Sequence, residues 1–123
     1  MLESIFTNEG ARLESLNFVF CSDSYLLKIN RDFLSHDFYT DIITFDLSEE
    51  TSGTIIGEVY ISVDRVKDNA LKLDASFNEE LLRVVFHGAL HLCGYKDKKK
   101  NEIAEMREKE EQYLRLFKRL RSK

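Results

Sequence analysis

The alternation of apolar and polar residues along the chain predicts several short strands and longer helices. Apolar residues in every second position predict a strand over residues 13–21, and β-branched and aromatic residues predict two more over 41–47 and 55–62. Apolar residues at helical spacing predict four helices, over 23–34, 63–73, from 77 to the glycine at 94, and 101–120. Residues 1–11 carry little periodic signal, so no element is predicted there.

The order of these elements indicates an α+β fold. The strands 41–47 and 55–62 are joined by a polar, flexible turn, which favours an antiparallel hairpin. We therefore expect a single domain over residues 1–123, with a small mixed β-sheet covered by helices. Its length of 123 residues suits one hydrophobic core.

The helix that follows residue 76 is predicted to be the buried centre of the fold. Ser76 and Glu79 form a capping box at its start, and its apolar residues lie nearly all round it. One polar stripe interrupts them, formed by Arg83, His87 and His91 at steps of four. Because an unpaired buried polar group costs about 1–3 kcal/mol, such a stripe indicates a wet cavity. Arg83 could bind phosphate there, although pairing with a carboxylate is its more ordinary role.

Two histidines and a later aspartate suggest a metal site on this helix. His87 and His91 stand one helical turn apart, Gly94 can turn the chain back, and Asp97 can bring up a carboxylate. A lone histidine in an apolar helix is usually a core residue, but this combination resembles the frame of the long zinc-protease motif. We predict one Zn²⁺ per chain, bound by these three side chains with a position left for water. Gly88 stands where the proteases have their catalytic glutamate, which counts against peptide hydrolysis.

Composition and charge indicate which class of protein this is and where in the cell it acts. Hydrophobic residues make up 43% and charged residues 33% of the chain, and no apolar run approaches the ~20 residues of a membrane span. No signal peptide is evident, and Cys21 and Cys93 are interpreted as buried thiols, so we expect a cytoplasmic protein without membrane contact. The net charge of −4 is unfavourable for binding nucleic acid. Four lysines around Asp97 either contact phosphate or form a solvated turn: Lys96, Lys98, Lys99 and Lys100.

Three sequence blocks resemble the YbeY family. Residues 87–95, H-G-A-L-H-L-C-G-Y, match its H-G-x-L-H-L-x-G-Y motif. Residues 40–45 and 57–62 resemble its T-D-V-L-S-F and G-D-I-x-I-S segments, and Asn30 stands ten residues before Thr40 as a family asparagine does. The resemblance implies a metal-dependent endoribonuclease that cleaves single-stranded rRNA, including 16S rRNA, during ribosome maturation. It also implies rRNA, ribosomal subunits or ribosome-associated proteins as partners, with no DNA expected.

The resemblance is incomplete at the site. Asp97 replaces the family's third histidine, and Leu34 stands where the family usually has an arginine. Arg31 or His36 is the candidate substitute, which makes these two and Arg83 the predicted catalytic residues. Family members also carry a further strand and helix ahead of residue 13, which are shortened or rebuilt here. Two alternatives stay open: a metallopeptidase-like hydrolase, and a non-catalytic ribosome-associated module with structural zinc.

Overall fold

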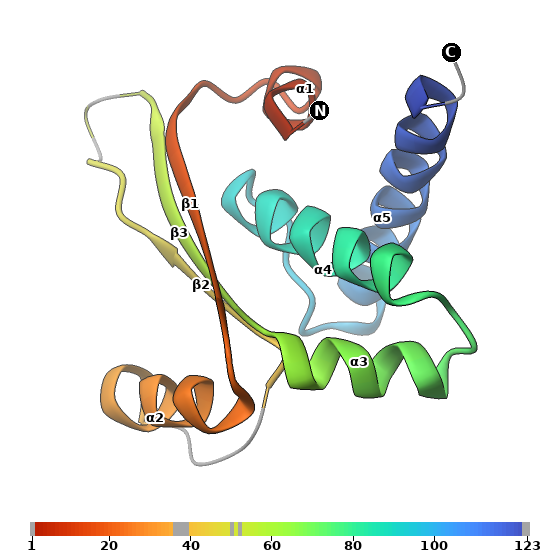
Figure 1. Ribbon diagram of the computed structural model, residues 1–123. Coiled ribbons are helices and arrows are strands. Elements are labelled where there is room, and N and C mark those ends of the chain that lie inside the picture. The colour runs from red at the N-terminus through yellow and green to blue at the C-terminus, as the bar shows by residue number, and fades with distance from the viewer. Residues whose placement is uncertain (1, 36–39, 50, 52, 122–123) are drawn as a thin grey trace.

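A computed structural model describes residues 2–35, 40–49, 51 and 53–121 (Figure 1). The described elements are the helices α1 (Leu2–Asn8), α2 (Asp23–Leu34), α3 (Val63–Lys72), α4 (Phe77–Leu92) and α5 (Lys100–Arg121), and the strands β1 (Leu13–Cys21), β2 (Ile42–Asp46) and β3 (Ile55–Ser62). No helix of this part of the chain is long and apolar enough to cross a bilayer.

The strands form one mixed sheet in the order β1-β3-β2. β2 and β3 pair antiparallel, with Ile42 opposite Ile61 and Asp46 opposite Gly57, which confirms the predicted hairpin. β1 pairs with β3 in parallel, so two strands that are distant in sequence become neighbours. The α+β class expected from the sequence is confirmed.

α4 lies between the sheet and α5, with α1 beside it, as predicted for the buried centre of the fold (Figure 1). The Ser76 half of the predicted capping box is present, because the Glu79 backbone N–H donates to Ser76 Oγ at 3.1 Å. The Glu79 carboxylate instead accepts from Lys118 Nζ at 3.4 Å. Two glycines let helix and sheet approach closely. A Cβ on Gly57 of β3 would lie 2.5 Å from Leu92 Cδ1, and one on Gly88 of α4 would lie 3.0 Å from Ile42 Cδ1. This close packing sets the distance between α4 and the sheet.

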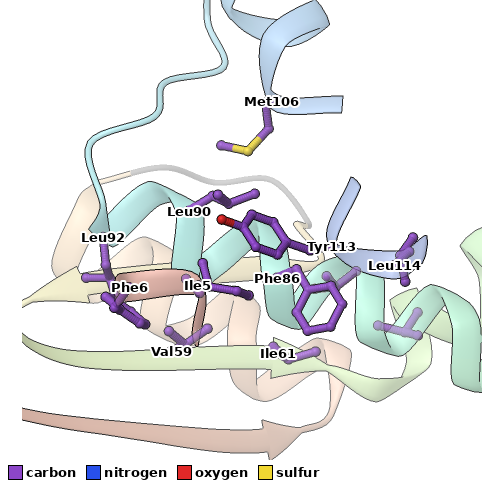
Figure 2. Packing of buried hydrophobic residues seen from close by; sticks show 13 residues of the cluster. Ile5, Phe6, Val59, Ile61, Phe86, Leu90, Leu92, Met106, Tyr113 and Leu114 are labelled. Carbon is purple, nitrogen blue, oxygen red and sulfur yellow. The ribbon is translucent and has the colours of Figure 1, made fainter. Parts of the chain in front are cut away.

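The main core fills the space between the sheet, α1, α4 and α5 (Figure 2). Its buried members come from distant parts of the chain and include Ile5, Phe6, Val59, Ile61, Phe86, Leu90, Met106 and Tyr113. α1 was not predicted, because a helix of 7 residues shows too few turns for a periodic signal. It contributes Ile5 and Phe6, both buried, so packing stabilises it.

A smaller core lies under α2 on the other face of the sheet, built from Leu26, Ile29 and Ile43. Several of the apolar residues whose helical spacing predicted the helices are exposed, most clearly Phe33 at 72%. Leu73 and Ile103 are likewise exposed, while the apolar Met106 and Tyr113 of α5 are buried. The predicted burial of both cysteines was also wrong in degree, because Cys21 and Cys93 are only partly buried.

Candidate metal centre

His87, His91 and Asp97 converge at one point beside the C-terminal half of α4. Asp97 Oδ2 lies 3.2 Å from His87 Nε2 and 3.4 Å from His91 Nε2. One ligand atom from each residue lies within 4.8 Å of the others, so the cluster could hold a metal ion. Ligands about 2.0–2.1 Å from a tetrahedral Zn²⁺ are separated by about 3.3–3.4 Å, which matches the two carboxylate–imidazole separations.

The turn after α4 positions two of these groups. Gly94 takes φ +105°, a conformation that side chains rarely adopt, and the Tyr95 N–H donates to the Leu90 carbonyl at 3.1 Å. The reversal brings the Tyr95 carbonyl oxygen to 2.9 Å from His91 Nδ1. Because a carbonyl only accepts, His91 Nδ1 carries the proton and a neutral His91 presents a lone pair at Nε2.

Glu110 of α5 accepts the Nδ1 proton of His87, as the Tyr95 carbonyl does for His91. Its Oε2 lies 2.6 Å from His87 Nδ1, and the residue is only 4% exposed. A carboxylate that accepts from Nδ1–H leaves Nε2 of the neutral imidazole as a lone pair. The Asp97 oxygen therefore faces two Nε2 atoms, and such a cluster is stabilised by positive charge, either a proton on an imidazole or a metal ion coordinated by all three groups, so the donor set fits a metal ion.

Arg83 lies one turn before His87 and is held by carboxylates. Its guanidinium forms ion pairs with Glu80 at 3.3 Å, with Glu110 at 3.7 Å and with Glu111. Burial acts to lower the pKa of Arg83, but the hydrogen bond and charge of Glu111 and the neighbouring carboxylates raise it above its ordinary value. This is the carboxylate-pairing role considered for Arg83 from the sequence. The pairing also holds Glu110 against His87.

A cleft of about 1060 Å³ opens in front of the three candidate ligands. Asp41, just before β2, lines it, and burial raises the pKa of its carboxyl group, although the charge of His87 acts in the opposite direction. The pKa of His87 is itself raised, because Glu110, Asp97 and Asp41 outweigh the effect of burial. The cleft is thus an electrostatically negative place in which positive charge is stabilised.

The other predicted site residues are more scattered. Lys98 lines the cleft, whereas Lys96, Lys99 and Lys100 are exposed and are not among its lining residues. Arg31 is exposed on α2 and also does not line the cleft, although Leu34 on the same helix does. His36 falls outside the described residues.

Sequence reasoning missed Glu110 and Asp41. The signal for Glu110 was available, since Met106, Glu110 and Tyr113 share one face of α5 at helical spacing and an acidic residue on a buried face requires a partner. Asp41 lies within a block that was matched to the family but was given no role. Gly88 faces Ile42 and Val59 in the sheet, so a longer side chain at the protease glutamate position would enter the core.

The family model described as "Endoribonuclease YbeY" matches residues 1–118. The chain belongs to the YbeY family. It is 54% identical over 117 residues to the endoribonuclease YbeY of Cytophaga hutchinsonii, covering 95% of this chain and 81% of that one. The chain is also 46% identical over 113 residues to the endoribonuclease YbeY of Porphyromonas gingivalis, covering 92% of this chain and 74% of that one.

A solution structure from Thermotoga maritima has the same fold. It aligns with a TM-score of 0.67 and 34% sequence identity over 98% of this chain and 79% of that one. The resemblance noted in the sequence is thus confirmed at the level of the YbeY family and of its fold. His87 and His91 belong to the H-G-x-L-H-L-x-G-Y block that carried the resemblance, and Asp97 lies two residues past its end.

Proposed function

We propose that this YbeY-family protein is a zinc-dependent endoribonuclease that hydrolyses single-stranded RNA in rRNA processing, including 16S rRNA maturation. In this proposal residues 1–123 act as one hydrolase domain in the cytoplasm, with ribosomal subunits or ribosome-associated proteins as partners. Family membership supports the endoribonuclease activity. The observation that carries the metal part is the convergence of His87 Nε2 and His91 Nε2 on one Asp97 carboxylate oxygen, with each Nδ1 held by an acceptor.

Each residue of the site has a distinct task. His87, His91 and Asp97 would hold the ion and leave one coordination position open. A zinc ion supplies Lewis-acid chemistry there, lowering the pKa of a water ligand to about 7 and polarising a phosphoryl oxygen. Glu110 and the Tyr95 carbonyl fix the tautomers of the two imidazoles.

The remaining predicted residues act around this core. Arg83 holds Glu110 in place and is thus a positioning residue. His36 and Arg31 stay the predicted substitutes for the family arginine. The carboxylate of Asp97 gives the ion more negative charge than a third imidazole, so a weaker Lewis acid is expected. Lys98 and its neighbouring lysines would offset that charge at the phosphates.

Zinc content and RNA cleavage together test the proposal. The purified protein is analysed for metals, then incubated with single-stranded and duplex RNA, with and without a chelator. We expect about one zinc per chain and chelator-sensitive cleavage of the single strand in preference to the duplex. Cleavage of peptides instead of RNA would support the metallopeptidase alternative. Stoichiometric zinc held by four protein ligands, without RNA cleavage, would support the structural-zinc alternative.

The lysines of the α4–α5 turn give a separate test of RNA contact. Each phosphate neutralised on a single strand contributes about 0.7 to the salt slope of binding, so three engaged lysines contribute about 2. Changing Lys98, Lys99 and Lys100 together to serine should flatten the slope and weaken RNA binding with zinc content unchanged. An unchanged slope would mean that they form a solvated turn.

A further inference from the structure

Two walls of the cleft carry the same combination of side chains. At the end of α3, Lys72 is followed by Leu73, and both line the cleft. On α5, Ile103 and Arg107 line it as well. The candidate ligands on α4 line the same cleft, so each wall offers one cation and one apolar side chain beside the proposed reaction centre.

The cation of the α3 wall is available to a ligand. Lys72 Nζ pairs with Asp68 at 3.1 Å, but both side chains are largely solvent-exposed, so the pair stabilises little and is readily exchanged for a phosphate. Leu73 beside it is 56% exposed although it faces a cleft. An exposed leucine inside a concave site is covered when a ligand with an apolar face binds there.

The α5 wall repeats this arrangement on one helix face. Ile103 and Arg107 stand four residues apart and are therefore neighbours, separated by about 6 Å along the helix axis. Ile103 is 47% exposed, and Arg107 reaches Glu110 only at 4.0 Å. The guanidinium can thus bind a phosphate by its fork of donors without leaving a tight partner.

We propose that single-stranded RNA crosses this cleft from α3 to α5, with the phosphates on either side of the cleaved one held by Lys72 and Arg107 and the flanking bases packed on Leu73 and Ile103. The inference rests on the proposed function, because it assigns the substrate path of that same site. Bases in a duplex are stacked and paired, so only unpaired nucleotides can place a base on each aliphatic side chain. Aliphatic contacts carry no hydrogen-bond code, so little preference for base identity follows.

The cationic part is tested with paired substitutions. Lys72→Ser with Arg107→Ser should raise the KM for a short single-stranded RNA and lower the salt slope of binding by about 1.4, which is two phosphate contacts. Lys67→Ser with Arg115→Ser is the matched control, since it removes the same charges from exposed positions of the same two helices that do not line the cleft. Equal effects of the two pairs would overturn the assignment. If the unmodified protein neither bound nor cleaved RNA, both this assignment and the proposed function would be overturned.

The apolar part is tested by removing the bases from the ligand. The unmodified protein should bind a single-stranded RNA more tightly than an abasic ribose-phosphate strand of the same length. Leu73→Ser with Ile103→Ser should narrow that difference, leaving the salt slope unchanged. Leu71→Ser with Leu120→Ser is the control, because these residues are 82% and 50% exposed but do not line the cleft. The base contacts would be refuted if the affinity difference between RNA and the abasic strand narrowed no more in Leu73→Ser with Ile103→Ser than in the control variant.

Discussion

Removing Glu110 should weaken zinc binding although Glu110 is not a proposed ligand. Its Oε2 accepts from His87 Nδ1 at 2.6 Å, at a site that is 4% exposed. A hydrogen bond to a charged group contributes about 1.5–3 kcal/mol, and loss of such an outer partner typically lowers metal affinity about 10–100-fold. We therefore expect Glu110→Ala to raise the zinc Kd by about 10–100-fold, because His87 loses its tautomer and orientation.

Two further variants separate the possible causes. Glu110→Gln keeps an oxygen that can accept from Nδ1–H but removes the charge, so it should raise the zinc Kd less than Glu110→Ala. Glu111→Gln removes the same charge from the neighbouring position, which pairs with Arg83 and has no described contact with His87. Its zinc Kd should stay close to that of the parent protein.

A chelator-competition titration measures the zinc Kd of all four proteins, and thermal unfolding of the zinc-free forms shows whether each is folded. The reasoning is refuted if Glu110→Ala is folded and binds zinc as tightly as Glu111→Gln. In that case the Glu110 contact serves the packing of α5 and not the imidazole.

Further predictions concern the ligands and the N-terminal helix. His87→Ala or His91→Ala should abolish stoichiometric zinc binding, and metal content near that of the parent in both variants would exclude the site. Asp97→His should keep the metal and preserve or raise hydrolysis of RNA, because a neutral imidazole leaves more charge on the ion. Asp97→Ala should bind zinc more weakly than the parent protein. If the two bound zinc equally tightly, Asp97 would not be a ligand. Burial alone would raise the pKa of Glu9, but hydrogen bonds led by the one from Tyr113 at 2.6 Å lower it. Glu9→Gln should then lower the free energy of unfolding by about 1–2 kcal/mol at pH values above about 4.3, the pKa of an unfolded glutamate. This loss of stability should shrink as the pH falls through the pKa of Glu9 in the folded protein. Denaturant unfolding of both proteins at several pH values measures the loss, and a loss that does not change with pH would contradict the reasoning.

The parts of the fold that local chemistry determines could be predicted from the sequence. The capping box at Ser76 marked the start of α4, and the apolar residues around that helix showed that it would be buried. The spacing of His87 and His91 placed both imidazoles on one face of the helix. Each of these features depends on residues within a single helix or its cap, so no knowledge of contacts between distant elements was needed.

The features that sequence reasoning missed depend on contacts between distant residues. The parallel pairing of β1 with β3 joins residues 40 or more positions apart, and alternation along one strand does not identify its partner. Glu110 supports His87 from 23 residues away, because α5 returns along α4. Phe33 continues the helical spacing of α2, but it meets only the edge of the Phe45 ring and is 72% exposed, so periodicity overstated its burial.

The charge balance of the cleft bears on how a protein with a net charge of −4 can hold RNA. Among the described residues that line it, the carboxylates outnumber the cations by one: Asp41, Asp46, Glu80, Asp97 and Glu110 against Lys72, Arg83, Lys98 and Arg107. With neutral histidines, a divalent ion at the proposed site reverses the sign of this balance. Charges farther away than about 8–10 Å are largely screened at physiological salt, so the local balance matters more to a bound phosphate than the charge of the whole chain. With the proposed ion bound, the acidic surface elsewhere would then do little to oppose RNA binding. The ion proposed to supply the chemistry would also make the cleft attractive to RNA.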